Sequence, residues 1–294
     1  MGTTLMTGAT RGLGRHAAAH LLRTRPDDHL VVLARGEVPL SAPNLTVVPC
    51  DLTSFADIRR AVGDVVPMLG GQLPPLTGFL GNAGVQQTST SDTTADGFER
   101  TFGVNVLAYH LLLTLLRDHF AAGSRILVVG SDVHFGTWRH GFGAIPPPRW
   151  DDVRALAAPR PGGVREGRRA YATSKLGVIY LVHALQRRLP AGTDAYTYNP
   201  GFVPGTGLIR DADPVSRALV ASIGHVLRLT PAATGQVRAG RVMAETMTGP
   251  RPAEGGAYID RGRVIPSSAE SYDVEREEDL WRVADALCGV TTTA

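Results

Sequence analysis

The chain has 294 residues, a length suited to one large α/β domain or two small domains. Hydrophobic residues make up 43% and charged residues 19%, so a sizeable core is possible and global disorder is excluded. The net charge is only +3 and no basic run carries interleaved aromatic residues, so no nucleic-acid partner is expected. No apolar window approaches the ~18 residues of a membrane span and no leader-like segment precedes the first apolar run, so we expect a cytoplasmic protein.

Two cysteines, Cys50 and Cys288, are too few for a disulfide framework or, by themselves, a zinc site. We expect both to be ordinary packing residues, and no metal site is expected. Of the 30 Lys and Arg residues, only Lys175 is a lysine. An arginine is bulkier and always charged, so the retained lysine indicates a position where a compact ammonium group is required.

Short apolar runs alternate with longer amphipathic segments along the chain, which favours βαβ units and a parallel sheet. The expected strands are residues 3–7, 30–34, 45–49, 76–80, 125–129, 195–198 and 256–259. The expected helices are residues 12–25, 54–66, 98–116, 274–287 and one that carries Tyr171 and ends near residue 189. The sequence therefore predicts an α/β protein of one domain, residues 1–294, with a doubly wound parallel sheet of about seven strands.

Three segments are expected to be added to this alternating pattern. Residues 132–169 are rich in Gly, Pro and Arg and predict an insertion beside the active site, whereas residues 201–230 predict a lid over the strand ends. Residues 270–294 predict a C-terminal helix docked on the body. The insertion carries six aromatic residues, which either line a roomy substrate pocket or anchor the loop: His134, Phe135, Trp138, His140, Phe142 and Trp150.

A glycine-rich turn, TGATRGLG at residues 7–14, joins the first strand to the first helix. Glycines let the backbone turn tightly and approach a pyrophosphate, while the helix N-terminus supplies N–H donors and a positive dipole end. The spacing is GxxxGxG, and its place in the first βα turn of a parallel α/β pattern favours a dinucleotide site. The residues expected to bind the cofactor here are Gly8, Thr10, Arg11, Gly12, Leu13 and Gly14.

The end of the second strand indicates which dinucleotide is used. An acidic residue there would bind a ribose 2′-hydroxyl, whereas an arginine accommodates a 2′-phosphate. Arg35 occupies the tip, and Arg11 in the glycine-rich turn offers a second cation. We therefore expect NADPH as the cofactor, with Asp51 and Leu52 after the third strand flanking the adenine.

Tyr171 and Lys175 are four residues apart and therefore lie on one face of a helix. A tyrosine is a poor acid–base catalyst near neutral pH unless a nearby charge stabilises the phenolate, which a lysine one turn away does. Ser131 ends the fifth strand, where ligands of open α/β sheets gather, so its hydroxyl is placed to hold a substrate oxygen. Asn105 interrupts an apolar run and requires a buried partner.

In their order along residues 3–205, these motifs resemble the short-chain dehydrogenase/reductase family. The resemblance rests on TGATRGLG, Asp51-Leu52, Asn82-Ala83-Gly84, Asn105, Ser131, the Tyr171/Lys175 pair and Asn199-Pro200-Gly201. It implies a Rossmann-type fold and a nicotinamide cofactor that also contacts Asn82, Ala83, Gly84, Tyr171, Lys175, Pro200, Gly201 and Val203. It also implies a catalytic set made of Asn105, Ser131, Tyr171 and Lys175.

Within the family, FGVNVLAYHLLLTLL, RILVVGSDVH and residues 202–208 are most similar to the retinol dehydrogenase and protochlorophyllide reductase branch. That branch usually prefers NADP, in agreement with Arg35. Two features depart from the family pattern. Gly205 stands where the family has a threonine that contacts the nicotinamide carboxamide, and the segment between Ser131 and Tyr171 is longer than usual.

The resemblance implies NADPH-dependent reduction of a ketone or aldehyde, reversible with the alcohol. Tyr171 would donate the proton, Ser131 would polarise the carbonyl, Lys175 would lower the Tyr171 pKa and hold the nicotinamide ribose, and Asn105 would position a relaying water. The expected partner is a small-molecule carbonyl compound, and a tailoring reductase acting on a bulky secondary metabolite fits best. Reduction of an activated C=C bond and a non-catalytic NAD(P)-binding regulator remain as alternatives. The helix at residues 98–116 either forms the face of a homo-oligomer or is buried.

Overall fold

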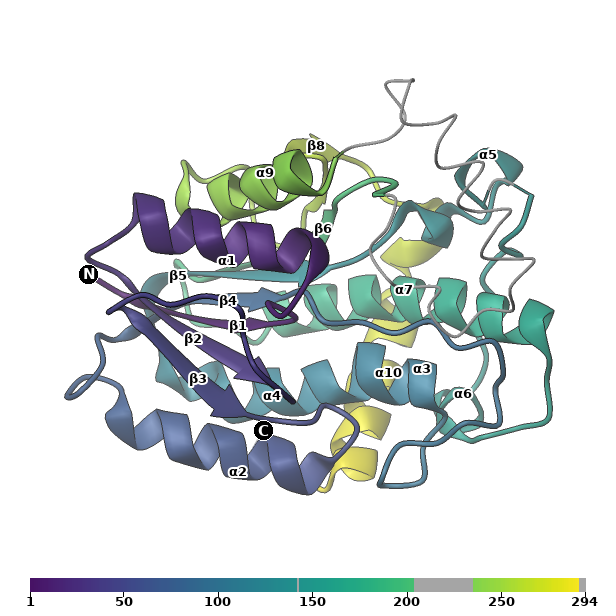
Figure 1. Cartoon of the computed structure of the whole chain (residues 1–294). Helices are drawn as coiled ribbons and strands as arrows, with labels where there is room; N and C mark the ends of the chain where they lie inside the picture. Colours follow the sequence, from purple (N-terminus) through teal and green to yellow (C-terminus); the bar gives the residue numbers. More distant parts are fainter. Residues whose placement is uncertain (142, 204–234, 291–294) are drawn as a thin grey trace.

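The computed structural model describes residues 1–141, 143–203 and 235–290. In these residues eight strands form one sheet in the order β3-β2-β1-β4-β5-β6-β7-β8 (Figure 1). Every neighbouring pair is parallel except β7 and β8. The strands are β1 (Thr3–Thr7), β2 (His29–Ala34), β3 (Leu45–Pro49), β4 (Leu76–Gly81), β5 (Phe120–Val129), β6 (Asp194–Asn199), β7 (Tyr258–Asp260) and β8 (Arg263–Ile265).

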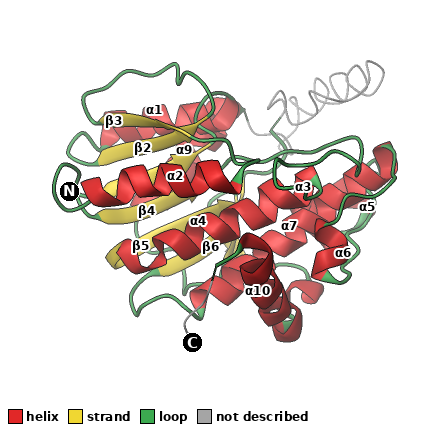
Figure 2. Ribbon diagram, turned by 90° about the horizontal axis from the view of Figure 1, so that it is seen from below, coloured by secondary structure: helices red, strands yellow, loops and turns green. Residues whose placement is uncertain are grey.

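Helices cover both faces of this sheet, with α1 and α9 on one face and α2, α4 and α7 on the other (Figures 1 and 2). The α-helices are α1 (Gly12–Thr24), α2 (Phe55–Val65), α3 (Arg100–Phe102), α4 (Ala108–Leu116), α5 (Trp138–Gly141), α6 (Val153–Ala157), α7 (Val164–Gln186), α9 (Gln236–Thr248) and α10 (Val274–Cys288). The shorter turns are η1 (Val66–Met68), the π-helix η2 (Gly103–Leu107), η3 (Arg117–His119), η4 (Asp132–Phe135) and η5 (Ala269–Tyr272). The predicted doubly wound α/β sheet is therefore confirmed.

The sheet separates two apolar cores, as expected for strands covered on both faces. Leu5 and Met6, adjacent on β1, are both fully buried but belong to opposite cores. This matches the near-continuous apolar runs of parallel strands, whose successive side chains point to opposite faces. On the side of α1 and α9, Gly240 allows close packing, because a Cβ there would lie 2.5 Å from the Leu13 carbonyl oxygen.

Several boundaries and elements differ from those expected. The sheet has eight strands in the described residues rather than about seven, since the hairpin partner β8 was not predicted. Helix α9 was also missed. The expected helix at residues 98–116 is interrupted by a π-helical turn at Gly103–Leu107. Helix α7 begins at Val164, so the last part of the predicted insertion is regular helix.

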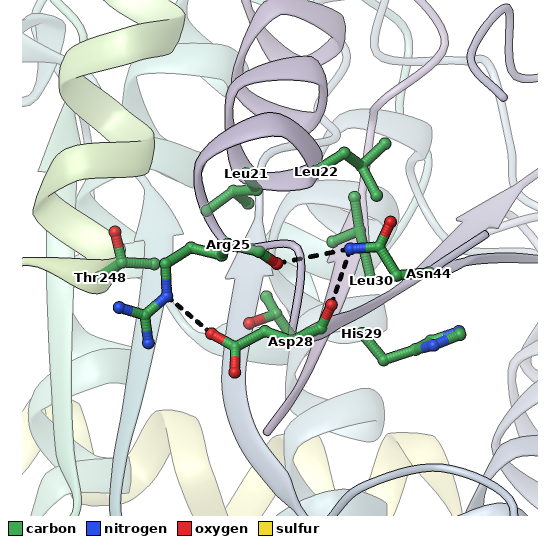
Figure 3. A pocket seen from close by; sticks show the side chains of 9 residues that line it. Leu21, Leu22, Arg25, Asp28, His29, Leu30, Asn44 and Thr248 are labelled. Atoms are coloured by element: carbon green, nitrogen blue, oxygen red, sulfur yellow. Dashed lines mark hydrogen bonds and ion pairs between the residues drawn. The ribbon is translucent and has the colours of Figure 1, made fainter. Parts of the chain in front are cut away.

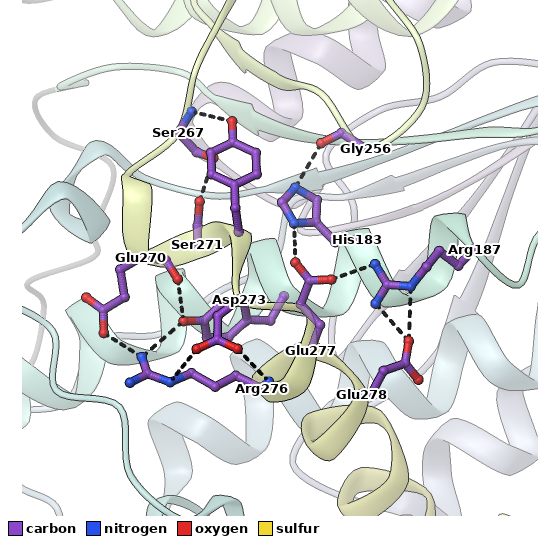
Figure 4. Close-up of polar contacts among 12 residues, drawn as sticks. His183, Arg187, Gly256, Ser267, Glu270, Ser271, Asp273, Arg276, Glu277 and Glu278 are labelled. Atoms are coloured by element: carbon purple, nitrogen blue, oxygen red, sulfur yellow. Dashed lines mark hydrogen bonds and ion pairs between the residues drawn. The ribbon is translucent and has the colours of Figure 1, made fainter.

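The C-terminal helix α10 docks on the body against α7, α4 and α6. Its Leu280 and Trp281 are buried. Glu277, 2% exposed, lies between His183 Nδ1 at 2.7 Å and Arg187 Nη1 at 2.6 Å, two groups on α7 (Figure 4). Because a buried carboxylate requires such partners, this ion-paired contact fixes how α10 lies on α7.

The two cysteines and the segment at residues 98–116 are packing elements of the core. Cys50 and Cys288 are free and buried, as expected. On α4, Leu111, Leu112 and Leu113 are all fully buried within the chain, so this stretch serves the core. Of the two interpretations of residues 98–116, the packing favours the buried one.

Candidate active site

The glycine-rich turn lies at the carboxyl end of β1 and opens into the N-terminus of α1. Gly8 and Gly12 have φ values of +74° and +57°, in the left-handed region that side chains rarely adopt. Asn82 Nδ2 donates to the Gly8 carbonyl oxygen at 2.8 Å. A Cβ at Gly14 would lie 2.1 Å from that oxygen, so the turn is closely packed and only glycine fits at this position. Arg11, the N-cap of α1, makes no side-chain cap, which leaves the first-turn N–H groups available to an anion.

The loop that carries Asn82, Ala83 and Gly84 is fixed by two hydroxyl groups. Ala83 N donates to Thr7 Oγ1 at 3.1 Å, and Tyr109 Oη donates to the Ala83 carbonyl at 2.6 Å. Thr7 Oγ1 and Tyr109 Oη are themselves 2.9 Å apart. Sequence analysis missed Tyr109, although a phenol within the apolar run of α4 is a signal of the same kind as Asn105.

Two exposed arginines stand near the predicted 2′-phosphate position. The Arg35 side chain is 62% exposed, with Nη1 3.8 Å from Asp51 Oδ2, and Arg11 is also exposed. Asp51 Oδ1 accepts from Thr53 N at 2.9 Å, which orients this carboxylate after β3. Leu52, its neighbour, packs partly buried against the core. No acidic residue occupies the tip of β2, where Arg35 stands.

Ser131, Tyr171 and Lys175 come together beyond the carboxyl end of β5. Tyr171 and Lys175, on α7, are 5% and 4% exposed. Lys175 Nζ lies 5.6 Å from the centre of the Tyr171 ring and donates to the Val129 carbonyl at 2.8 Å. The Ser131 hydroxyl lies near enough to the Tyr171 phenol to lower the pKa of that phenol. The structure thus brings together three side chains that are up to 44 residues apart.

Burial controls the ionisation of both α7 side chains. It raises the pKa of the Tyr171 phenol above its ordinary value, an effect that the Asp132 charge increases and the Ser131 hydroxyl opposes. Burial also lowers the pKa of Lys175 to about 8. Desolvation is the largest effect on the Tyr171 pKa, and the expected lowering of that pKa by Lys175 stays a prediction. Tyr171 is therefore a neutral phenol, the form that holds a proton to donate.

Asn105 has the buried partners that its position requires. On the π-helix η2, its Oδ1 accepts from Val85 N at 2.9 Å, and its Nδ2 donates to the Val85 carbonyl at 2.9 Å and to Ser174 Oγ at 3.0 Å. A Cβ on Gly84 would lie 3.3 Å from Asn105 Oδ1 and 3.6 Å from Lys175 Nζ. Asn105 and Lys175 therefore border the same small space beside the 82–84 loop.

His134 anchors the backbone of Ser131. Its Nδ1 lies 2.6 Å from the Ser131 carbonyl oxygen, and its Nε2 lies 3.2 Å from the backbone N of Ser268. A carbonyl requires a donor and an N–H requires an acceptor, so the network assigns the proton to Nδ1 of a neutral ring. Burial, the largest cause, lowers the pKa of His134 to about 4, in agreement with a neutral imidazole.

Most aromatic residues of the insertion pack inward. Phe135 contacts the rings of His134, His140 and Tyr258, with centroids 4.1, 4.6 and 6.2 Å away. Trp150 packs on Tyr180 with centroids 4.6 Å apart. For these residues the anchoring interpretation is the one that the contacts support. Trp138, at 80% exposed, is the exception, and Phe142 lies outside the described residues.

The segment after β6 is described only at its beginning. Gly201, with φ +74°, follows Pro200, and its N–H donates to Asn199 Oδ1 at 3.1 Å. Val203 is buried in the core beneath α1 and α9. Gly205 and the rest of the predicted lid lie outside the described residues.

Two hollows lie elsewhere in the described chain. The larger has a volume of about 630 Å³ and is lined by residues of α7, β7, β8 and α10, among them His183, Tyr258, Val264 and Glu277. The smaller hollow, at the opposite, amino-terminal end of the strands, has a volume of about 20 Å³, enough for about one water molecule (Figure 3). Its rim is tied by Asn44 Nδ2, which donates to the Asp28 carbonyl at 2.8 Å. Among residues 1–141, 143–203 and 235–290, no group of three or more His, Cys, Asp or Glu side chains has the arrangement of a metal site. None of the described helices is both long and apolar enough to cross a bilayer.

The sheet order and the site at its carboxyl edge define a Rossmann-type oxidoreductase fold. A family model for short chain dehydrogenase matches residues 2–141. Across 98% of this chain and 77% of the relative, the sequence is 27% identical to protochlorophyllide reductase A from Arabidopsis thaliana. It is 28% identical to polyprenol dehydrogenase from Danio rerio, over 97% of this chain and 86% of that protein. The chain is thus similar to the short-chain dehydrogenase/reductase family and, within it, to these two relatives.

Solved structures share the same fold. An uncharacterised protein from Mycobacterium paratuberculosis aligns with a TM-score of 0.69 and 22% identity, covering all of this chain and 96% of that one. The NADPH-bound carbonyl reductase from chicken fatty liver aligns with a TM-score of 0.63 and 19% identity, over 90% of this chain and 98% of that one. At this level of identity the likeness extends to the fold alone.

Proposed function

We propose that this protein is an NADPH-dependent carbonyl reductase that reduces a ketone or aldehyde and runs in reverse on the alcohol. The observation that carries this proposal is the arrangement of Ser131, Tyr171 and Lys175 beyond the end of β5. A neutral phenol, a hydroxyl beside it and an ammonium group are the parts needed to protonate a carbonyl oxygen. The similarity of the chain to this oxidoreductase family supports the same chemistry.

The residues present fit a nicotinamide dinucleotide. The turn has no room for a Cβ at Gly8 or Gly14 and presents the N-terminus of α1, which suits a pyrophosphate. Arg11 and Arg35 would hold a 2′-phosphate, Asp51 and Leu52 would flank the adenine, and the 82–84 loop would line the path to Lys175. When bound, NADPH supplies the hydride.

The protein's own groups would handle the proton and orient the substrate. Ser131 Oγ and Tyr171 Oη, which lie near each other, would both form hydrogen bonds to the substrate oxygen. Tyr171 would donate its proton as negative charge develops there, and the Lys175 ammonium would then stabilise the phenolate that remains. Asn105 would position the 82–84 loop through its two bonds to Val85 and brace α7 through Ser174.

The test is NADPH oxidation with a panel of aldehydes and ketones, with wild type and Tyr171→Phe compared. Removing a general acid costs about 100-fold or more, so Tyr171→Phe is expected to lose nearly all turnover while it still binds NADPH. Tyr180→Phe is the matched control. Tyr180 lies on the same helix as Tyr171, but its hydroxyl donates to the Glu270 carbonyl and takes no part in the proposed site. NADPH binding without turnover of any compound by wild type would favour a non-catalytic regulator instead.

A second candidate is reduction of an activated C=C bond. It is supported by the likeness to several protochlorophyllide reductases, which are 26–28% identical over 98% of this chain. Conjugated enones separate the two candidates, because they offer both bonds to the same enzyme. Formation of the allylic alcohol supports carbonyl reduction, whereas a saturated ketone as product supports the second candidate.

A further inference from the structure

A carboxylate that the proposed mechanism does not use lies next to the proposed proton donor. Asp132 follows Ser131 in the chain, and Ser131 Oγ donates to Asp132 Oδ1 at 3.4 Å. The same Ser131 hydroxyl lies near enough to the Tyr171 phenol to lower the pKa of that phenol. Asp132, Ser131 and Tyr171 are therefore three neighbouring polar side chains, with Ser131 between the carboxylate and the proposed proton donor.

Charged and titratable groups face Asp132 from every element around it. Asp260 and Tyr258 approach from β7, His140 from α5 and Tyr171 from α7. Contact with Asp260 at 2.9 Å raises the pKa of the guanidinium of Arg261, which follows β7, and the Asp132 charge also raises it.

The carboxylates of Asp132 and Asp260 differ in their ion-pair and hydrogen-bond partners. Asp260 has the Arg261 ion pair and accepts a hydrogen bond from Asn199 Nδ2 at 2.9 Å. In the part of the chain that the structure describes, no cationic group lies within 4.0 Å of the Asp132 carboxylate. Burial, the largest cause, and the Asp260 charge raise the pKa of Asp132, against the opposing effects of His140 and Ser131. The surroundings thus shift Asp132 toward its protonated form.

The protonation state of Asp132 decides where the single hydrogen of the Ser131 hydroxyl points. An ionised carboxylate only accepts, so it draws the Ser131 hydrogen toward itself. A protonated carboxyl group donates to Ser131 Oγ instead, and the Ser131 hydrogen is then free to point at another oxygen. The second arrangement is the useful one, because an oxygen that gains negative charge during reduction needs donors aimed at it.

We propose that Asp132 is a positioning residue that acts in its protonated form, donating to Ser131 Oγ and so directing the Ser131 hydrogen toward the reacting oxygen. No covalent bond is made or broken in this step, because only hydrogen bonds change direction. The role of Ser131 comes from the proposed function, so this role of Asp132 rests on it.

Three variants test the proposal: Asp132→Asn, Asp132→Ala and the exposed control Asp151→Asn. An asparagine amide donates at every pH, so Asp132→Asn is expected to keep kcat/KM within about 5-fold of wild type near pH 5. Wild type and Asp151→Asn should lose activity as the pH rises through the raised pKa of Asp132, and Asp132→Asn should lack that decline. Asp132→Ala, which cannot donate, should be at least 10-fold slower at every pH while NADPH affinity stays within a few-fold.

Unfolding of the protein without added NADPH gives a readout that does not depend on turnover. A carboxyl group whose folded-state pKa is raised binds more protons folded than unfolded, so wild-type stability falls as the pH rises through that pKa. The melting temperature of Asp132→Asn relative to wild type is therefore expected to be higher at pH 8 than at pH 5. A decline of kcat/KM in Asp132→Asn that matches wild type would overturn the role of Asp132 while the proposed function stands. If none of the carbonyl compounds tested supports NADPH oxidation by wild type, the proposed function is overturned, and the role of Asp132 with it.

Discussion

Asn105 Nδ2 donates to Ser174 Oγ at 3.0 Å, a contact between the π-helix η2 and helix α7. Ser174 Oγ donates in turn to the Tyr171 carbonyl at 2.8 Å. Neither residue has any exposed surface. The backbone that carries the proposed proton donor is thereby tied to the 82–84 loop through Asn105.

Ser174→Ala is therefore expected to destabilise the fold. The substitution leaves one Asn105 amide hydrogen without its partner in a buried site, at a cost of about 1–3 kcal/mol of unfolding free energy. Urea unfolding measures this loss. Thr114→Val is the matched control, because in the described residues the buried Thr114 hydroxyl has no hydrogen-bond partner, and it should change stability by less than about 0.5 kcal/mol. Equal effects of the two substitutions would contradict the bridging role of Ser174.

Lys175→Arg is expected to reduce kcat by about 100-fold, although the positive charge is kept. The ammonium is 4% exposed, donates to the Val129 carbonyl and lies against Gly84. A planar guanidinium is larger and fixes its donors in a fork, so it would displace the groups around it. The measurement is kcat at saturating NADPH, with circular dichroism to check folding. A folded variant that keeps more than about a third of wild-type kcat would show that charge alone suffices.

The pKa of Lys175 also predicts how stability depends on pH. Its folded-state pKa of about 8 lies below the ordinary 10.5, so between these values the unfolded chain binds more protons than the folded one. Stability therefore gains a contribution on the order of 3 kcal/mol as the pH rises from 8 to 10.5. Lys175→Met should lack this contribution. Urea unfolding of both proteins at pH 7.5 and pH 10 compares them, and an identical pH dependence would refute the buried-charge explanation.

Arg35→Ala is expected to weaken NADPH binding by about 10–150-fold, the range for losing a charge-assisted phosphate contact of 1.5–3 kcal/mol. NADH lacks the 2′-phosphate, so its Kd should stay within about 2-fold. Arg15→Ala, on the exposed face of α1, is the control and should affect neither cofactor. Equal Kd values of wild type for NADPH and NADH would be the result that excludes the assignment.

The two described tryptophans of the insertion are expected to respond differently to truncation. Trp150→Ala removes the ring packed on Tyr180 and Phe102 and should cost about 3 kcal/mol. Trp138→Ala alters a side chain that is 80% exposed and should change stability by less than about 0.5 kcal/mol. Thermal unfolding distinguishes them. A comparable loss in both variants would mean that Trp138 also packs in solution.

The sequence by itself determined the features that depend on local patterns. The strands at residues 3–7 and 45–49, the capped start of α2 at Ser54 and the glycine-rich turn were predicted, because alternating runs, caps and glycines act over a few residues. The four-residue spacing of Tyr171 and Lys175 placed them correctly on one helix.

Only the tertiary structure decided what depends on distant partners. β8 becomes a strand by pairing with β7, and α9 packs on α1 where Gly240 meets Leu13, two contacts that no local period encodes. The partners of Asn105 and the hydroxyl of Tyr109 that holds the 82–84 loop also come from elsewhere in the chain. The pKa values of Tyr171, Lys175 and Asp132 follow from burial and neighbouring charge, which exist only once the sheet and α7 enclose them.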